Sequence, residues 1–308
     1  MNKIRTRLLV VGGNGFIGRH VVQHALSLGW DVTSLSLALP DPGHQRPDVW
    51  YVAADIANSG VLSTALADTS FNYVVNCGGY IDHTLFFSGG RKVFDTHFAG
   101  VLNLVQLLNR NVLSAFVNIG SSDEYGNTPP PQIETHREAP ISPYSLGKVA
   151  ATHFLQMLYR TEGFPSTTLR LFLTYGPGQD AGRFLPQIIQ GCLAGRTFPT
   201  SEGRQLRDFC FIEDTVSAIF AALISPNARG EVINIASGTG VSIRQMIELV
   251  QSQIGKGEPR FGDIAYRPGE NMALWADVSK ARTLLGWAAN TTLADGLAKT
   301  IQWYKGGA

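Results

Sequence analysis

The sequence predicts an α/β protein in which a doubly wound parallel sheet carries a smaller α/β lobe toward its C-terminus. Apolar runs typical of buried strands alternate with helical stretches through the first half of the 308-residue chain. A glycine-rich turn follows the first apolar run. After Tyr175 the pattern changes to short strands, helices and loops punctuated by Gly and Pro. We therefore expect residues 1–174 to form the larger domain and residues 175–308 to form mainly the second lobe.

The apolar runs and the breaks between them place the individual elements. Strands are expected at residues 8–11, 32–37, 50–53, 73–76, 115–119 and 167–173. Helices are expected at residues 16–28, 93–109, 143–161, 242–254 and 293–304. A further strand at residues 231–236 indicates that the chain returns to the larger domain near residues 231–254.

The turn after the first strand has the glycine spacing of a dinucleotide-binding loop. Gly12 would allow a sharp turn, Gly15 the approach of a pyrophosphate, and Gly18 the packing of the new helix on its strand. The amide groups of Phe16 and Ile17 at the helix start would face the phosphates. An ordinary tight turn is the alternative, but the strand and helix around it favour a Rossmann-type cofactor site.

Composition and charge exclude several classes of partner. The chain has 25 basic and 24 acidic residues and no long charged run, so neither a nucleic-acid groove nor a membrane-binding surface is expected. No segment approaches the roughly 20 apolar residues of a membrane helix. The three cysteines are far apart and lack C-x-x-C spacing, which predicts no zinc or other metal site and no disulfide framework. These features indicate a cytoplasmic protein with a small-molecule partner.

Two side chains at the start of the helix at 143–161 are candidates for proton transfer. Tyr144 and Lys148 are four residues apart and so share one helix face. A lysine ammonium near a phenol favours the phenolate, which makes Tyr144 a candidate general acid and base. Alone, such a pair is more often simply exposed. However, Ser121 and Ser122 follow a central strand at the carboxyl edge where open α/β sheets bind ligands.

Together, the glycine turn, the serine pair and Tyr-x-x-x-Lys resemble the extended short-chain dehydrogenase/reductase family. This family comprises nucleotide-sugar epimerases, dehydratases and reductases. Further similar stretches cover nearly the whole chain, at residues 55–56, 169–172, 175–178, 207–209, 212–214, 234–238, 266–270 and 285–287. The resemblance implies an NAD(P) cofactor, a nucleotide-diphosphate sugar substrate bound by the second lobe, and a homodimer formed through the helices at 93–109 and 143–161.

The resemblance also implies catalytic roles. Tyr144 would exchange a proton with a sugar hydroxyl or carbonyl, while Lys148 would lower the pKa of that tyrosine and hold the nicotinamide ribose. A serine would donate a hydrogen bond to the same sugar oxygen. Counting back from Gly126 favours Ser121 for this role. Aligning Asp-Glu at 123–124 with the dehydratase pattern Thr-Asp-Glu favours Ser122 instead.

Binding residues are implied in the same way. Arg207 and Arg267 match positions at which relatives hold the substrate diphosphate, and guanidinium groups suit phosphate oxygens. Surface salt bridges are the alternative for both. Asp55 would contact the adenine with Ile56 packed beside it, although Asp55 could instead cap a helix.

The chain departs from the family pattern at three further positions. Relatives that prefer NAD usually have an acid at the end of the second strand, where this chain has Ser36. NADP(H) is therefore the favoured cofactor and NAD(H) the alternative, with Arg46 as a candidate phosphate partner. His97 and Leu173 each replace an expected asparagine and could alter how the sugar is held. A histidine packed in the core is the alternative for His97.

Residues 120–126 bear on the reaction. A 4,6-dehydration needs an acid and a base beyond the tyrosine, and Asp123 and Glu124 are candidates. The segment is nevertheless more similar to that of 4-keto-6-deoxyhexose reductases. We therefore predict NADPH-dependent reduction of a nucleotide-linked 4-keto-6-deoxyhexose at C4. The alternatives are a 4-epimerase or 4,6-dehydratase that retains NAD(P), and a non-catalytic dinucleotide-binding sensor.

Overall fold

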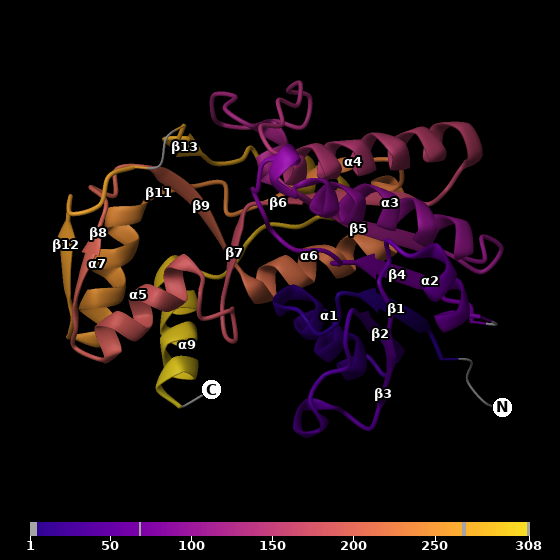
Figure 1. The fold of residues 1–308 in the computed structure, drawn as a ribbon, viewed down its shortest axis with the longest axis horizontal. Helices are drawn as coiled ribbons and strands as arrows, with labels where there is room; N and C mark the ends of the chain where they lie inside the picture. Colours follow the sequence, from indigo (N-terminus) through magenta and orange to yellow (C-terminus); the bar gives the residue numbers. More distant parts are fainter. Residues whose placement is uncertain (1–4, 68, 267–268, 307–308) are drawn as a thin grey trace.

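A seven-stranded parallel sheet forms the larger part of the molecule (Figure 1). The structure is a computed structural model that describes residues 5–67, 69–266 and 269–306. The strand order is β10-β6-β5-β4-β1-β2-β3. The strands are β1 (Arg7–Val11), β2 (Asp31–Ser36), β3 (Val49–Ala53), β4 (Tyr73–Asn76), β5 (Ala115–Ser121), β6 (Ser166–Leu171) and β10 (Val232–Ile235). The predicted Rossmann-type α/β fold is confirmed.

Helices cover both faces of this sheet. On one face lie α1 (Phe16–Ser27) and α6 (Ile212–Ile224), and on the other lie α2 (Ser59–Ala65), α3 (Arg91–Leu107) and α4 (Pro143–Glu162). Successive side chains of β1 point to opposite faces of the sheet. Leu8 and Val10 pack in the core under α1 and α6, and Leu9 and Val11 pack in the core under α2, α3 and α4. Burial on both faces explains why the strands appear in the sequence as continuous apolar runs.

The strand order places a ligand-binding crevice next to the glycine turn. From β1 the chain builds the sheet outward through β2 and β3 on one side, and then through β4, β5 and β6 on the other. In such open sheets the crevice forms at the carboxyl ends of the strands, where the order reverses. The turn at residues 12–15 directly follows β1 and therefore lies at this point.

Local signals in the sequence set the ends of α4. Ser142 Oγ accepts a hydrogen bond from Ser145 N at 3.1 Å, and Ser145 Oγ accepts one from Ser142 N at 3.0 Å. Pro143 occupies the first turn, and Gly163 ends the helix with a φ of 67°. These caps fix Tyr144 in the first turn of α4. None of the described helices, α4 included, is both long and apolar enough to cross a membrane.

The smaller lobe combines short strands with three mutually packed helices. Its helices are α5 (Phe184–Leu193), α7 (Ile243–Ile254) and α9 (Leu293–Lys305). Its strands are β7 (Leu173–Tyr175), β8 (Thr197–Thr200), β9 (Leu206–Phe211), β11 (Gly240–Ser242), β12 (Glu258–Phe261) and β13 (Ala273–Leu274). The remaining elements are α8 (Ser279–Leu285), which packs against β10, and the 3₁₀ turns η1 (Pro42–His44), η2 (Phe86–Ser88), η3 (Ser122–Tyr125) and η4 (Pro226–Ala228).

Two expected elements differ from the structure. The strand expected at residues 167–173 is divided, because β6 ends at Leu171 and β7 leaves the large sheet to pair with β9. Of residues 231–254, only β10 lies in the large sheet, while β11 pairs with β9 and α7 packs on α5 and α9. The chain therefore returns to the large sheet for one strand, and α6 before it covers that sheet.

We expect replacement of Gly18 by Ala to destabilise the protein. A Cβ at Gly18 would lie 2.1 Å from the carbonyl oxygen of Gly12, so helix and turn would have to separate. Overpacking of this kind costs about 1–3 kcal/mol in the free energy of unfolding. Thermal denaturation of Gly18→Ala measures the loss. Gly60→Ala in α2 is the control, because its Cβ would come no closer than 3.6 Å to Asn58 Oδ1; equal stability of both variants would contradict the packing argument.

Candidate active site

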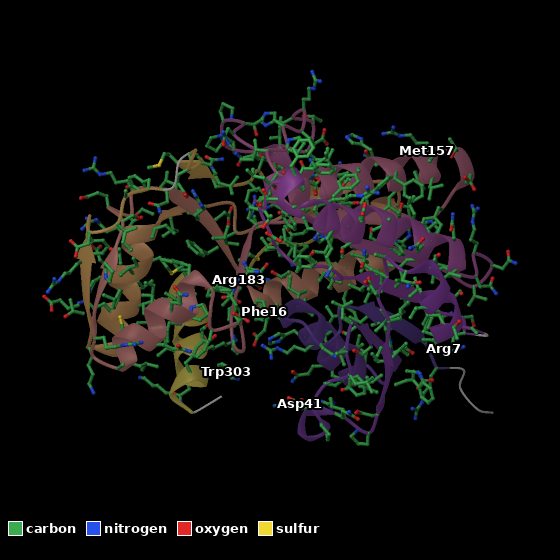
Figure 2. All side chains as sticks on the ribbon, viewed as in Figure 1. Arg7, Phe16, Asp41, Met157, Arg183 and Trp303 are labelled. Atoms are coloured by element: carbon green, nitrogen blue, oxygen red, sulfur yellow. The ribbon has the colours of Figure 1, made fainter. Side chains whose placement is uncertain are left out.

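A cleft of about 730 Å³ opens at the carboxyl ends of the large sheet's strands. Its lining comes from the glycine turn, the segment after β4, the end of β5, the start of α4 and the smaller lobe. Figure 2 shows Phe16 of α1 and Arg183 at the start of α5, one from each part of the molecule, and both line this cleft. A ligand in the cleft would therefore contact both parts.

The glycine turn fits a diphosphate. Gly12 has a φ of 73°, and a Cβ there would lie 2.8 Å from the carbonyl oxygen of Cys77, so packing requires glycine. Gly15 caps α1, and the first residues of the helix, Phe16, Ile17 and Gly18, line the cleft. Amides in the first turn of a helix have no intrahelical acceptor and attract anions. The turn can therefore hold the diphosphate of a dinucleotide in the way the sequence predicts.

Tyr144 is buried in the cleft beside Ser121. Only 5% of Tyr144 is exposed. Burial raises the pKa of Tyr144, and hydrogen bonding from Ser121 opposes that rise. The tyrosine is therefore a phenol at neutral pH in the absence of a ligand. Both candidate serines line the cleft. Ser121 is the serine that hydrogen-bonds toward Tyr144. Ser122 is the first residue of η3 and is only 3% exposed.

Lys148 is held by the end of β5. Its Nζ donates a hydrogen bond to Ile119 O at 2.7 Å and lies 5.9 Å from the centre of the Tyr144 ring. Burial lowers the pKa of Lys148 to about 8, although the charge of Glu124 opposes the shift. The structure thus brings Ser121, Tyr144 and Lys148 together, as the resemblance implies.

The two carboxyl groups at residues 123–124 have different surroundings. Asp123 lines the cleft, and its Oδ2 lies 3.7 Å from Nε2 of His83. Burial raises the pKa of Asp123, and the charges of His83 and Arg207 oppose this. Glu124 is 0% exposed, and its carboxylate is bound to Arg170 at 2.9 Å, away from the cleft. An acid–base role for Glu124 does not fit this position, because its side chain points into the protein interior and not into the cleft.

Two histidines lie close to Tyr144. The ring of His97 meets the ring of Tyr144 edge-on with centroids 5.0 Å apart, and its Nε2 lies 2.9 Å from Tyr80 O. Burial, followed by the charge of Lys148, lowers the pKa of His97 to about 3. His97 is therefore a neutral, buried histidine that also lines the cleft. His83, which belongs to no recognisable motif in the sequence, has its ring centre 5.7 Å from that of Tyr144.

The structure describes one of the two arginines that were expected to hold the substrate diphosphate. Arg207 does not line the cleft; its guanidinium is ion-paired with Glu270, close enough to Asp123 to affect that carboxyl group. Arg267 lies outside the described residues. Arg183 lines the cleft, and its charge partly opposes the rise that burial causes in the pKa of Tyr144. No motif surrounds Arg183 in the sequence, so only the approach of the two parts of the molecule reveals it.

Residues expected around the adenosine have mainly local contacts. Ser36 Oγ accepts a hydrogen bond from Asn14 N at 3.1 Å, which ties the glycine turn to the end of β2. Asp55 Oδ1 accepts one from Ala57 N at 2.9 Å, whereas Asn58 caps α2, so the alternative of a helix cap at Asp55 is wrong. Ile56 is buried, with 5% exposure. Neither Asp55 nor Ile56 lines the cleft.

A second hollow of about 360 Å³ borders the glycine turn at Gly13. Arg19, His44 and Arg46 line it. Arg46 Nε also lies 3.3 Å from Asp48 Oδ1. Arg46, the candidate phosphate partner ten residues beyond Ser36, therefore lines the same hollow as Gly13 of the glycine turn.

Leu173 begins β7 and lines the cleft, so a leucine side chain occupies the position where an asparagine was expected. An apolar side chain at this point contributes no hydrogen bond to a sugar. Across the described ranges, no group of three or more His, Cys, Asp or Glu side chains is arranged to hold a metal ion. Polar groups line the cleft beside Tyr144 from β5, η3 and α4.

Comparison with known proteins agrees with this geometry. The model of the NAD-dependent epimerase/dehydratase family matches residues 8–236. The chain belongs to this family. The match spans the glycine turn, the serine segment, Tyr144 and Lys148, and it ends directly after β10. The family includes the extended short-chain dehydrogenase/reductases that the sequence resembles.

Individual members of the epimerase/dehydratase family align over almost the full chain. A dTDP-glucose 4,6-dehydratase of Xanthomonas campestris pv. campestris (strain B100) is 30% identical over 330 aligned residues, covering 96% of this chain and 92% of the relative. The crystal structure of a UDP-glucose 4-epimerase from Thermotoga maritima with UDP-glucose matches with a TM-score of 0.90 at 24% identity, covering 98% and 99% of the two chains. A dTDP-glucose 4,6-dehydratase from Streptomyces venezuelae with NAD bound matches with a TM-score of 0.86 at 24% identity, with 98% of each chain covered.

We expect His97 to make the protein less stable in mild acid. Its pKa is lowered from 6.5 to about 3 on folding, so between these values the unfolded chain binds more protons and stability falls as the pH falls. From pH 7.5 to 5.5 this one group would remove about 1.4 kcal/mol from the free energy of unfolding. Urea denaturation at the two pH values, compared with His97→Asn, measures the difference. An equal loss in both proteins would show that His97 is not the titrating group.

Proposed function

We propose that the protein is a nucleotide-sugar 4-epimerase that oxidises and re-reduces C4 of a nucleotide-linked hexose with a cofactor retained through the cycle. The observation that carries the proposal is the meeting of Ser121, Tyr144 and Lys148 at the carboxyl edge of the sheet, in the cleft that the glycine turn also lines. Family membership supports the class of reaction. The substrates named for relatives, dTDP-glucose and UDP-glucose, support a nucleotide-linked glucose as the substrate class.

The residues at this edge can move one proton. A bound nicotinamide would supply the hydride acceptor and donor. The Ser121 hydroxyl would hydrogen-bond the C4 oxygen of the sugar, and the Tyr144 oxygen would take the hydroxyl proton and later return it. The phenolate needed for the first step would be favoured by the hydrogen bond from Ser121 and the charge of Arg183, and Lys148 places a further positive charge 5.9 Å from the ring centre. When hydride returns to C4, the carbonyl oxygen becomes an alkoxide, which is more basic than a phenolate, so the Tyr144 phenol can give the proton back to it.

The position of Glu124 favours epimerisation over 4,6-dehydration. Elimination of water needs a base at C5 and an acid at C6 in addition to the tyrosine. Of the two candidate carboxyl groups, only Asp123 faces the cleft, while Glu124 is bound to Arg170 in the interior. The names of the sequence relatives favour the dehydratase, which is the second candidate. The C4 reductase predicted first from residues 120–126 has less support than either retained-cofactor reaction.

The proposal predicts conversion without added reductant. Incubation of the purified protein with UDP-glucose or dTDP-glucose should give the C4 epimer, identified by proton NMR. Tyr144→Phe should lower kcat about 10²–10⁴-fold, because general acid–base catalysis contributes that much. Tyr159→Phe, on the exposed side of the same helix, is the matched control and should retain full activity. A 4-keto product lighter by one water would establish the dehydratase, and stoichiometric NADPH consumption with a 4-keto sugar would establish the reductase.

We further propose that the cofactor is NADP(H), although the family is named for NAD. The end of β2 offers the hydroxyl of Ser36 in place of the carboxylate that would repel a 2′-phosphate. Arg19 and Arg46 line the hollow beside Gly13, next to this strand end. A guanidinium group binds phosphate strongly and directionally.

Cofactor binding can be tested without a sugar substrate. Trp303 lines the same hollow, so its fluorescence provides a local signal. Arg46→Ala should weaken NADP⁺ binding about tenfold, as expected for loss of one charge-assisted hydrogen bond, and leave NAD⁺ binding unchanged. Arg110→Ala is the control, since Arg110 is similarly exposed and ion-paired, with Glu162. Tighter binding of NAD⁺ than NADP⁺ to the unaltered protein would contradict the proposal.

The homodimer and the cytoplasmic location stay predictions. α3 and α4 pack against each other at one side of the sheet, and Met157 of α4 lies at the outer edge in Figure 2. Met157 and Leu146 on α4 are 44% and 48% exposed, so the outer face of this helix carries apolar groups. This is consistent with the homodimer that we propose for the enzyme.

A further inference from the structure

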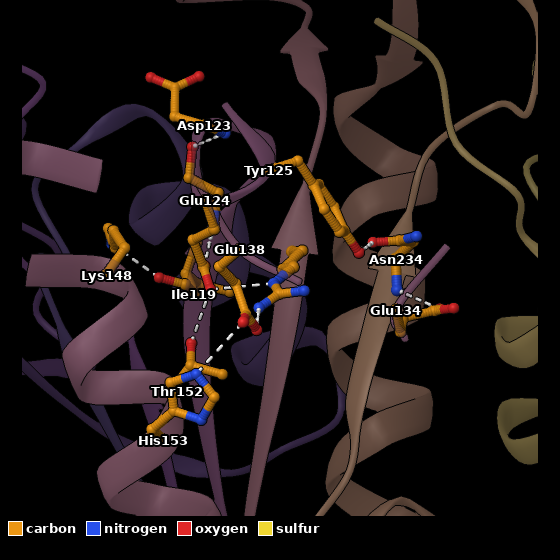
Figure 3. Close-up of polar contacts among 12 residues, drawn as sticks. Ile119, Asp123, Glu124, Tyr125, Glu134, Glu138, Lys148, Thr152, His153 and Asn234 are labelled. Carbon is orange, nitrogen blue, oxygen red and sulfur yellow. Dashed lines mark hydrogen bonds and ion pairs between the residues drawn. The ribbon is translucent and has the colours of Figure 1, made fainter. Parts of the chain in front are cut away.

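Glu124 connects three segments of the site at one buried carboxylate (Figure 3). Its Oε1 accepts a hydrogen bond from the backbone amide of Ser121 at 2.9 Å. Its Oε2 accepts one from Thr152 Oγ1 at 3.0 Å and one from Arg170 Nε at 2.9 Å. Ser121 ends β5, Thr152 belongs to α4 and Arg170 belongs to β6. The side chains of Glu124 and Arg170 have no exposed surface.

We infer that Glu124 is a positioning residue that holds Ser121 in register with Tyr144. Tyr144 and Thr152 lie eight residues apart on α4, so a tie from Glu124 to Thr152 is a tie to the helix that carries the tyrosine. The same carboxylate accepts a hydrogen bond from the backbone amide of Ser121, and the Ser121 hydroxyl faces Tyr144. The inference rests on the proposed function only where it concerns turnover.

The carboxylate is anchored on its far side as well. Arg170 Nη2 also contacts Glu138 Oε1 at 2.5 Å, and the guanidinium lies 4.6 Å from the centre of the Tyr125 ring. Tyr125 Oη in turn donates to Asn234 Oδ1 at 2.7 Å, which links η3 to β10. Two carboxylates and an aromatic ring therefore fix Arg170, and Arg170 fixes Glu124. Glu124 does not line the cleft, so it acts through Ser121 and not on the substrate.

A carboxylate suits this place better than an amide. All three partners of Glu124 are donors, and an ionised carboxylate only accepts. Glutamine would keep one accepting oxygen for Ser121 but would place an NH₂ group against the guanidinium of Arg170, which only donates, and Thr152 would lose the oxygen to which it donates. The end of β5, which carries Ser121, would then shift relative to α4. Misplacement of a reacting group by about 1 Å can cost about 100-fold in rate.

The first test compares Glu124→Gln with Glu138→Gln. Each variant removes one of the two carboxylates that pair with Arg170, so both should lower Tm. Only Glu124→Gln disturbs the oxygen that accepts from both Thr152 and Arg170 and so loosens the tie between the end of β5 and α4, and it should lower kcat about 10- to 100-fold. Its KM and cofactor affinity should stay within about threefold, because it makes no contact in the cleft. Equal losses of kcat in both variants would overturn the inference and leave a purely structural ion pair.

The tie to α4 can be examined separately at Thr152. Thr152→Val removes the hydroxyl that Glu124 accepts from and should lower kcat, whereas Thr152→Ser keeps the hydroxyl and should retain kcat. Loss of activity in Thr152→Ser to the same extent as in Thr152→Val would indicate that packing of the methyl group matters, and not the hydrogen bond.

A measurement without substrate separates this inference from the proposed function. The ¹³Cζ resonance of Tyr144, assigned with the Tyr144→Phe variant, reports the hydrogen bonding of the phenol. It should move in Glu124→Gln and keep its position in Glu138→Gln. An unchanged resonance in Glu124→Gln would overturn the positioning role. A shifted resonance in a protein that converts no nucleotide sugar would leave the positioning role standing and reject the proposed function.

Discussion

The buried ion pair between Glu124 and Arg170 determines how the site is assembled. Neither side chain has exposed surface, and removing one partner of such a pair leaves an uncompensated charge inside the protein. Burial disfavours the charge on Arg170, but Glu124, Tyr125 and Glu138 together outweigh burial and raise the pKa of the guanidinium. The pair therefore holds β5, η3 and β6 in one arrangement, and Thr152 extends that arrangement to α4.

The cleft is built in two different ways on its two sides. At the glycine turn, close backbone contacts at Gly12 and Gly18 leave space for no other residue, so geometry alone sets the position of the helix amides. Near Tyr144, hydrogen bonds of polar side chains set the geometry. Lys148 donates to the backbone oxygen of Ile119, and Ser121 faces the phenol. The first arrangement suits binding of a diphosphate that undergoes no reaction. The arrangement near Tyr144 keeps ionisable groups buried. Burial shifts their pKa values away from those of exposed side chains, as is common at sites of proton transfer.

Several details were beyond sequence reasoning because they depend on distant contacts. Two ways of aligning the motif favour Ser121 and Ser122 in turn, and only the folded chain places Ser121, at the end of β5, beside Tyr144. Glu124 follows Asp123 in the sequence, yet Arg170, which lies 46 residues further along, draws it into the interior. The division of the strand expected at residues 167–173 depends on β9, whose pairing with β7 takes the chain out of the large sheet. Arg183 enters the cleft from the smaller lobe without any local signal.

The sequence by itself determined the α/β fold class, the glycine turn and the Tyr144–Lys148 pair. These features depend on periodicity and spacing over a few residues, such as apolar strands buried on both faces and two side chains one helical turn apart. The tertiary structure alone decided which neighbouring polar groups face the cleft and which the interior. The reason is physical: a buried carboxylate must find donors, and for Glu124 those donors come from α4 and β6 as well as from its own loop. Only the folded chain brings these segments together.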